Sequence, residues 1–286
     1  MTNDPVDTRG AASIGLGQVL NQPRQASDSR VPHVVEFRQV TKTYSIGEPN
    51  AFTAIRDITF TVEDLANKGE FVGILGPSGC GKSTILRLIA GLEPQHPPTE
   101  GQVLVAGRPV TGPGADRGMV FQDYSSFDHR SVLDNVTFGL ECQRVPRRVR
   151  DEMGRDWIRR VGLDVSADAE KYPHELSGGM RQRVAIARTL ILRPRIILMD
   201  EPFGALDPLT RMNMQDLLIS LWREVQATVF FVTHSIEEAV YLGDRIYVLS
   251  SSPGTLVREI KVASPDRPAK EMQREPTFQE TVCSIR

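Results

Sequence analysis

The sequence predicts an α/β fold with a mixed and parallel core sheet, an antiparallel β subdomain near the N-terminus and an inserted helical subdomain. Three features of the pattern support this prediction. Apolar runs at 71–75, 195–199 and 228–232 have the length of buried parallel strands. Alternating, β-branched segments at 34–40 and 52–62 are typical of strands. Apolar residues between 149 and 161 instead recur every four positions, which indicates a helix.

The first part of the chain is expected to begin with a disordered tail at 1–33, where the residues are polar and show no periodicity. After the two alternating strands, the run at 71–75 ends in a glycine-rich loop. Residues 83–90 then continue as a helix, which Gly91 stops. Residues 101–110 have the pattern of a short hairpin with Gly107 near its turn.

A helical subdomain is predicted over residues 123–176. Pro146 suits the first turn of its helix, whose apolar stripe consists of Val149, Met153, Trp157 and Val161. Ser177 then stands at the N-cap position of the next helix. That helix ends before Pro194, and its buried face is expected to consist of Val184, Ala187, Leu190 and Ile191.

The end of the chain is expected to add a hairpin and a tail. Segments 245–250 and 255–261 flank Ser252-Pro253-Gly254, which is a turn signal. The main globular domain is therefore assigned to residues 34–262. Residues 263–286 are assigned to a C-terminal tail, since they are polar and too few to form a domain.

The composition is that of an ordinary globular protein. The 286 residues are 40% hydrophobic and 24% charged, enough to bury one large core or two small ones. The net charge of −2 gives no overall attraction to nucleic acid or anionic lipid. Three cysteines, Cys80, Cys142 and Cys283, show no paired spacing, which argues against a disulfide framework and favours a reducing cytoplasm.

The sequence also bears on membrane insertion. No run approaches the roughly 18–20 apolar residues that span a bilayer. The N-terminal segment carries Asp4 and Asp7 and lacks the apolar stretch of a signal peptide. If the protein works at a membrane, we therefore expect another chain to supply the span.

A glycine-rich segment fits the phosphate-binding pattern G-x-x-x-x-G-K-[ST] of P-loop NTPases without a mismatch. Backbone amides of such a loop, with the N-terminus of the next helix, form a nest for phosphate oxygens. Lys82 is expected to reach the β- and γ-phosphates of a nucleoside triphosphate, and the Ser83 hydroxyl to bind Mg²⁺. A chance glycine-rich turn is disfavoured by the strand before it and the helix after it. The loop consists of Gly76, Pro77, Ser78, Gly79, Cys80, Gly81, Lys82, Ser83 and Thr84.

Two carboxylates, Asp200 and Glu201, follow the hydrophobic run at 196–199. Asp200 is expected to hold Mg²⁺ through water, and Glu201 to act as general base toward the attacking water. Acidic residues at strand ends are common by themselves, so this interpretation depends on the phosphate loop.

The segment Leu176-Ser177-Gly178-Gly179-Met180 narrows the class of protein. Together with the phosphate loop, it resembles the ATP-binding cassette (ABC) superfamily over roughly residues 34–261, where this signature closes over ATP bound to a partner subunit. Amide donors and a positive helix-dipole end face outward at Ser177, Gly178 and Gly179. The resemblance therefore implies a head-to-tail dimer that holds two ATP molecules. A plain helix N-cap is the alternative, but it explains only Ser177.

The resemblance implies roles for four more residues. Gln122 corresponds to the glutamine that reaches Mg²⁺ and links the core to the helical subdomain. His234 corresponds to the switch histidine that contacts the γ-phosphate and steadies the water. Asp207, in Ala205-Leu206-Asp207, belongs to a loop that carries contacts across the dimer, although Gly204 stands where the family often has Ser. Tyr44 matches the aromatic residue that stacks on adenine, but an aromatic residue at a strand end is more often part of the core.

Three functional classes can carry a phosphate loop of this kind. The first is the ATPase subunit of a membrane transporter, and the second is a soluble ABC ATPase that acts on DNA, ribosomes or Fe–S assembly. An unrelated P-loop kinase or GTPase would not need the signature. A single cassette with a helical insert of ordinary size favours the transporter. The arginine-rich run at 144–160 is interleaved with acidic residues, so it indicates a solvated helix face better than a nucleic-acid patch.

Within transporters, the run at 121–141 is similar to that of bacterial importers of the nitrate/sulfonate/taurine type. One departure is Asp128-His129, which stands where that branch often has Pro-Trp. The resemblance implies a peripheral protein at the cytoplasmic face of the inner membrane. Its expected partners are a second copy of itself or a paralogous cassette, permease subunits and, indirectly, a solute-binding protein, with no nucleic acid. The sequence does not name the solute, because a cassette does not touch it.

Overall fold

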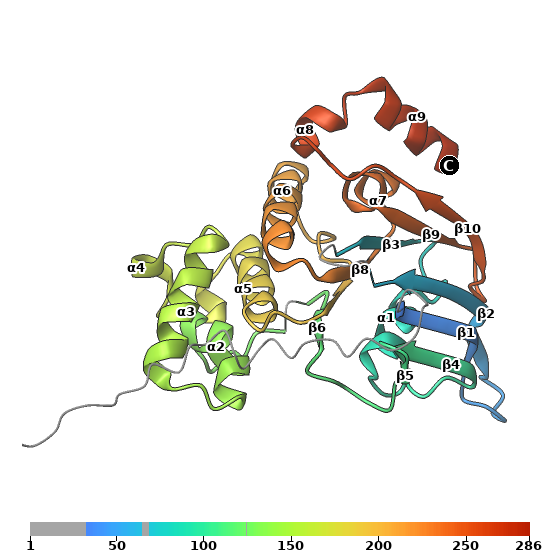
Figure 1. Ribbon diagram of the computed structural model, residues 1–286, viewed down its shortest axis with the longest axis horizontal. Coiled ribbons are helices and arrows are strands. Elements are labelled where there is room, and N and C mark those ends of the chain that lie inside the picture. The colour runs from blue at the N-terminus through green and yellow to red at the C-terminus, as the bar shows by residue number, and fades with distance from the viewer. Residues whose placement is uncertain (1–32, 65–68, 124) are drawn as a thin grey trace, which may run out of the picture. The chain divides into compact units, whose positions relative to one another are not determined.

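The computed structural model describes residues 33–64, 69–123 and 125–286, which fold around two β-sheets (Figure 1). The tail expected at 1–33 lies outside the described residues, except for His33, which begins the first strand. The two sheets and their covering helices agree with the predicted α/β fold that has a mixed and parallel core sheet.

The smaller sheet is antiparallel and has the strand order β2-β1-β4-β5. The predicted hairpin at 101–110 is confirmed as β4 and β5. Ala106 and Gly107 form its turn with φ of 49° and 74°, and positive φ at both positions is what a tight two-residue hairpin requires. The bounds of the four strands are β1 (His33–Tyr44), β2 (Phe52–Glu63), β4 (Glu100–Val105) and β5 (Arg108–Pro109).

The larger sheet has the strand order β10-β9-β3-β8-β7-β6, and its neighbouring strands are parallel except for the β9–β10 hairpin. Every residue of β3, β7 and β8 is buried, as expected for strands covered on both faces. The sequence analysis did not assign β6, a four-residue edge strand that is mostly half-buried. The bounds are β3 (Phe71–Leu75), β6 (Arg117–Val120), β7 (Ile196–Asp200), β8 (Thr228–Thr233), β9 (Arg245–Leu249) and β10 (Leu256–Lys261).

Side chains alternate between two cores on the faces of the larger sheet. In β8, Phe230 and Val232 face the core that contains α1 (Lys82–Ala90) and the antiparallel sheet. Val229 and Phe231 face the other core, which contains α5 (Gly178–Leu190), α6 (Pro208–Val225) and α7 (Ile236–Leu242). This period of two follows from strand geometry, because successive side chains of a strand point to opposite faces of the sheet.

The segment 123–176, expected to be a helical subdomain, contains α2 (Val132–Cys142), α3 (Arg147–Arg160), α4 (Val165–Asp168) and the 3₁₀ helix η1 (Pro173–Glu175). Trp157 and Val161 of the predicted stripe are buried, and Met153 packs against the same core. The predicted face of the next helix is also buried, because Val184, Ala187, Leu190 and Ile191 all lie in that core. Among the helices in the described ranges, none is long and apolar enough to cross a bilayer.

The C-terminal segment 263–286 was expected to be a tail, and the sequence analysis gave it no secondary structure. It instead forms α8 (Ala269–Met272) and α9 (Pro276–Ile285), drawn in red in Figure 1. Phe278 and Val282 of α9 are buried in the core that contains α7. The segment is polar overall, but its few apolar residues lie on one face, and that face packs against helices far away in the sequence.

The burial of α9 generates a first prediction. Phe278→Ala removes a ring that is 5% exposed, and such a deletion typically costs about 3 kcal/mol. We expect urea denaturation followed by circular dichroism to show a free energy of unfolding lower by that order. Glu280→Ala, a change at an exposed position of the same helix, should leave it within about 0.5 kcal/mol. Equal stability of the two variants would contradict the packing of α9.

Candidate functional site

The candidate site lies at one edge of the larger sheet. Because β3, β8, β7 and β6 are parallel, their carboxyl ends meet at the same edge, where open α/β sheets bind ligands. Each of these strands is followed by predicted site residues. They are the loop 76–84 after β3, His234 after β8, Glu201 after β7 and Gln122 after β6.

The glycine-rich loop connects β3 to α1 and has the backbone geometry of an anion nest. Gly79 and Gly81 have φ of 76° and 92°. A Cβ at Gly81 would lie 2.4 Å from Ile55 Cγ2, so only glycine fits there. Helix α1 begins without a side-chain cap and has no acidic residue in its first turn. Its first N–H groups are therefore available to an anion.

Lys82 is 5% exposed and curls over the loop that precedes it. Its Nζ donates hydrogen bonds to the carbonyl oxygens of Gly76 at 2.8 Å and Pro77 at 2.9 Å. These acceptors are neutral, so they do not cancel the ammonium charge. An ammonium has three donors, which leaves one for a ligand. The loop thus combines backbone donors with a positive charge, as phosphate binding requires.

Ser83 and Asp200 form a pair of oxygen ligands beside the loop. The Ser83 hydroxyl donates to Asp200 Oδ1 at 2.7 Å, and Asp200 is 4% exposed. Burial raises the pKa of Asp200, while the bond from Ser83 and the charge of Arg87 oppose that rise. A hydroxyl and a carboxylate side by side fit Mg²⁺, which prefers oxygen ligands and takes few of them from protein. Among the described residues, no group of three or more His, Cys, Asp or Glu side chains could hold a metal ion, so Mg²⁺ here would take its other ligands from phosphate and water.

Glu201 lies between Gln122 and His234. Gln122 Nε2 is 3.5 Å and His234 Nδ1 is 3.7 Å from the same oxygen, Glu201 Oε2. The Glu201 side chain is 23% exposed and that of His234 is 60% exposed, so the three surround a point that water can reach. Glu201 itself has φ of 45°, an unusual conformation for a residue with a side chain. The structure thus brings the three predicted catalytic residues together.

Tyr44 ends β1 and reaches the glycine-rich loop. Its hydroxyl oxygen lies 3.3 Å from Thr84 Oγ1, and the Lys42 ammonium lies 5.4 Å from the centre of its ring. Tyr44 is half-buried, so part of the residue remains accessible beside the loop. An aromatic ring in this position can stack on a planar base.

The signature segment, residues 176–180, lies away from the glycine-rich loop of the same chain. The Ser177 hydroxyl caps α5 by accepting a hydrogen bond from the Met180 N–H at 3.3 Å. A Cβ at Gly179 would instead lie 3.6 Å from Thr210 Cγ2, and Asp207 caps α6 by accepting from the Thr210 N–H at 3.1 Å. Figure 1 shows α5 and α1 well apart. Residues 177–179 and Asp207 therefore form a separate group.

Sequence reasoning missed two residues that support the site. Arg87 lies 3.9 Å from Asp200 Oδ2, and it follows Ser83 by four positions on α1. That spacing puts both on one helix face and could have identified it. Gln182, buried on α5, donates a hydrogen bond to the carbonyl oxygen of Pro202, next to Glu201. No local pattern in the sequence indicates this contact.

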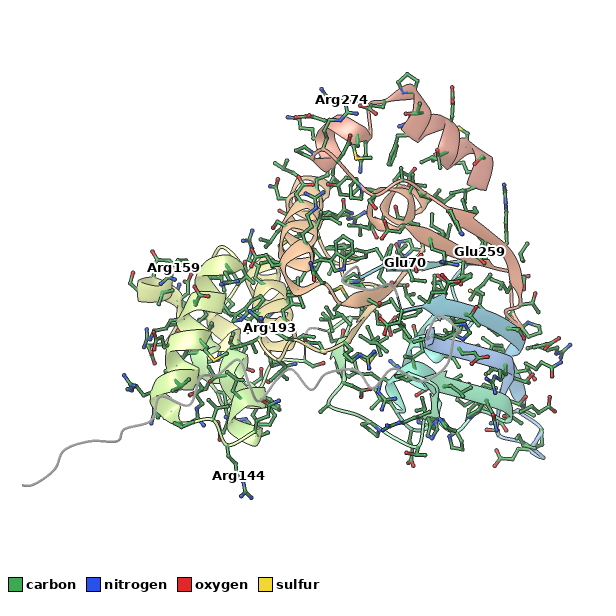
Figure 2. The ribbon with its side chains drawn as sticks, in the orientation of Figure 1. Glu70, Arg144, Arg159, Arg193, Glu259 and Arg274 are labelled. Atoms are coloured by element: carbon green, nitrogen blue, oxygen red, sulfur yellow. The ribbon has the colours of Figure 1, made fainter. Side chains whose placement is uncertain are left out.

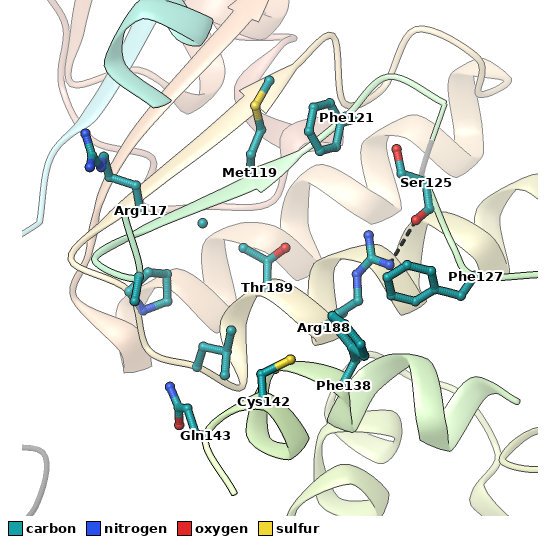
Figure 3. A pocket seen from close by; sticks show the side chains of 15 residues that line it. Arg117, Met119, Phe121, Ser125, Phe127, Phe138, Cys142, Gln143, Arg188 and Thr189 are labelled. Atoms are coloured by element: carbon teal, nitrogen blue, oxygen red, sulfur yellow. Dashed lines mark hydrogen bonds between the residues drawn. The ribbon is translucent and has the colours of Figure 1, made fainter. Parts of the chain in front are cut away.

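A cavity of about 560 Å³ opens between β6 and the helices α2 and α5 (Figure 3). Arg188 lies in it, donates to the Ser125 carbonyl oxygen at 2.9 Å and sits 5.3 Å from the centre of the Phe127 ring. Burial lowers the pKa of Arg188. The loop that carries Phe127 is held by the fully buried Asn135, which donates to its carbonyl and accepts from its N–H. The apolar lining includes Met119, Phe121, Phe127, Phe138 and Leu192.

Comparisons of the sequence with known proteins agree with this geometry. The profile of the family described as ABC transporter matches residues 55–204. An uncharacterized ABC transporter ATP-binding protein of Methanocaldococcus jannaschii is 54% identical over 228 residues, which cover 80% of this chain and 82% of that protein. The nitrate import ATP-binding protein of Synechocystis is 46% identical, covering 82% and 86%. The taurine import ATP-binding protein of Rhizobium johnstonii is 53% identical, covering 68% and 72%.

Solved structures are similar as well. A dimeric structure of a bacterial ABC transporter cassette has a TM-score of 0.69 and 35% sequence identity, and it covers 80% of this chain and 99% of that one. A dimeric post-hydrolysis state of an ATP-binding cassette bound to ADP and phosphate has a TM-score of 0.68 and 34% identity over the same shares.

The separation of Lys82 from Ser177 generates a second prediction. Lys82→Ala removes a charged donor, which typically costs about 1.5–3 kcal/mol, so nucleotide affinity of the isolated chain should fall about ten- to a hundredfold. Ser177→Arg should leave that affinity within about twofold, because Ser177 lies apart from the loop. Titration of the purified monomer with a fluorescent ATP analogue measures both. Equal damage by the two changes would contradict the separation.

Proposed function

The chain belongs to the ABC transporter family of ATP-binding subunits, and from this premise we propose that it powers a bacterial importer for a small anion such as nitrate, sulfonate or taurine. The observation that supports ATP hydrolysis most directly is the convergence of Lys82, Ser83 and Asp200 with Glu201 at one sheet edge. The relatives named for nitrate and taurine import support the importer class.

The residues around the loop bind and orient ATP. Loop amides and the α1 N-terminus hold the phosphates, and Lys82 adds charge at the β- and γ-phosphates. Tyr44 stacks on the adenine. Ser83, Asp200 and Gln122 would hold Mg²⁺, Asp200 through water, and the ion would supply positive charge at the phosphates.

Glu201 acts as the general base. It takes a proton from the water that attacks the γ-phosphorus, as the bond to the leaving ADP oxygen breaks. His234 contacts the γ-phosphate and, with Gln122, keeps the water in line. These two side chains already lie within 3.7 Å of the Glu201 carboxylate, so the three groups are close enough to contact the same water molecule.

A second cassette, identical or paralogous, completes each site. The helix N-terminus at Ser177, Gly178 and Gly179 presents donors, but it lies apart from the phosphate loop of its own chain. A head-to-tail dimer pairs this end with the ATP bound to the partner. The similar dimeric cassettes, at 34% and 35% identity, support this arrangement.

A permease is the proposed membrane partner. The cavity beside Phe127 has a mostly apolar lining that includes Phe121, the residue before Gln122, and it lies between the sheet and the helical subdomain. A helix of the permease would dock there, which places the chain as a peripheral subunit at the cytoplasmic face of the inner membrane. A solute-binding protein would deliver the anion to the permease on the other side.

A soluble ABC ATPase that acts on DNA, ribosomes or Fe–S assembly is the alternative function. The arginines of α3 do not favour it. Arg160 pairs with Asp156 at 2.6 Å, and Arg155 with Glu170 at 3.3 Å. Arg144, in the turn before α3, extends away from the helices (Figure 2). The ion-paired face is that of a solvated helix.

The base role of Glu201 generates a third prediction. Glu201→Gln keeps the shape of the side chain but cannot take the proton, so turnover should fall about 10²–10⁴-fold. ATP affinity should stay close to that of the wild type, and the variant should accumulate as an ATP-bound dimer. Steady-state ATPase assays and gel filtration with ATP measure these effects. An ATPase rate within a few-fold of wild type would remove Glu201 from the base role.

A fourth prediction concerns Phe127. Its ring packs on Phe138, with ring centres 4.6 Å apart, and borders the cavity. Loss of an aromatic anchor from an interface typically costs about 2 kcal/mol or more, so Phe127→Ala should release the cassette from the permease and abolish uptake. The isolated variant should stay folded and bind ATP.

Co-purification with the permease, uptake into cells and the melting temperature of the isolated chain measure this outcome. Asp123→Ala, an exposed change in the same loop region, serves as the matched control for assembly. A strong fall in melting temperature with normal assembly of the folded fraction would show that Phe127 belongs to the core and that docking occurs elsewhere.

A further inference from the structure

An ion pair between a buried carboxylate and a partly exposed arginine joins two helices near the candidate site. Glu238 lies on α7 and is 6% exposed, and its Oε1 lies 3.6 Å from Arg211 Nε on α6. Burial raises the pKa of Glu238, and the Arg211 charge opposes that rise. An ion pair that includes a buried carboxylate is often no more stabilising than apolar side chains of the same size. The role of this pair is therefore inferred from the other hydrogen bonds that Glu238 and Arg211 make.

Glu238 holds the backbone on both sides of His234. Its carboxylate accepts a hydrogen bond from the Thr233 hydroxyl at 2.7 Å, and that hydroxyl accepts one from the Ser235 N–H at 3.0 Å. The Glu238 N–H donates in turn to the Ser235 hydroxyl at 3.2 Å. Both neighbours of the histidine are thus bonded to one residue, although the His234 side chain itself is largely exposed.

Arg211 holds the loop of Ala205-Leu206-Asp207. Its side chain donates to the carbonyl oxygen of Leu206 at 3.0 Å, in addition to its contact with Glu238. The guanidinium is planar and rigid, so a shift of the Leu206 carbonyl moves the group that faces Glu238. A continuous chain of polar contacts therefore runs from this loop to the backbone that carries His234.

We propose that Arg211 and Glu238 are positioning residues that couple the 205–207 loop to His234 within one chain. Contact of a partner cassette with that loop then sets the orientation of the histidine beside Glu201. This inference rests on the proposed ATPase function and its dimer. The competing explanation is that the pair only fixes the packing of α6 against α7.

Charge-removing variants of the full-length chain distinguish these explanations. Arg211→Met leaves Glu238 buried without its cation, so its thermal midpoint should fall. Glu238→Gln can still accept the Thr233 bond but no longer attracts Arg211. The double variant Arg211→Met/Glu238→Gln has no unpaired buried charge, so its thermal midpoint should return toward that of the wild type.

Catalysis should behave differently from stability. In all three variants kcat should fall about ten- to a hundredfold, as a misplaced orienting group predicts. The KM for ATP and the ATP affinity of the monomer should stay within about twofold, because no group that binds ATP is changed. Glu237→Gln is the matched control. Glu237 is partly exposed, pairs with Arg286 at 3.2 Å, and a glutamine can still accept its bond from Ser235, so kcat should not change.

A stable double variant with low kcat and unchanged KM supports the proposal. A double variant that recovers both stability and kcat shows that the pair serves packing alone and overturns it, as does wild-type kcat in all three variants. A wild-type chain without ATPase activity would overturn the proposed function and this inference with it. An active wild type beside an equally active double variant overturns the inference alone.

Discussion

The parallel pairing of β3, β8, β7 and β6 is the constraint on which the rest of the structure depends. It brings together residues that lie far apart in the chain, because every loop at this edge leaves from a carboxyl end. The register is specific, with Leu75 opposite Thr233 and Asp200 opposite Val232. A slip by one residue would exchange the two buried faces. The two separate cores on those faces therefore hold the register, and the register places the chemistry.

The protein itself holds the two carboxylates of the site, Asp200 and Glu201, in fixed positions. Asp200 is almost fully buried, which disfavours its charged form, and the bond from Ser83 at 2.7 Å and the charge of Arg87 stabilise it. Glu201 adopts a positive φ, and its N–H is held by the Val232 carbonyl at 3.1 Å. Strain of this kind persists only where the surroundings enforce it. The sheet thus supplies the preorganised arrangement that electrostatic catalysis needs.

Much of the site could be predicted from sequence because its chemistry is local. The loop 76–84 is contiguous, and Glu201 and His234 each follow an apolar run that reads as a strand. Contacts that join distant segments could not be predicted in this way. Arg211 and Glu238 belong to no sequence motif, and Gln182 has no neighbours that mark it as buried. In α9, the buried Phe278 stands among polar residues. Only packing of α5, α6 and α7 on one sheet face reveals these contacts.

The arrangement also explains why one chain by itself is incomplete. The α5 N-terminus and the 205–207 loop lie together, as Gly179 and Asp207 both meet Thr210, but they lie apart from the phosphate loop of their own chain. The groups suited to contact a partner, the α5 N-terminus and the 205–207 loop, thus lie on one face. The groups suited to bind ATP lie at the sheet edge. A physical link between them is needed if closure is to control hydrolysis. Arg211 and Glu238 supply such a link through hydrogen bonds to Leu206 and Thr233 and through the charge attraction between them.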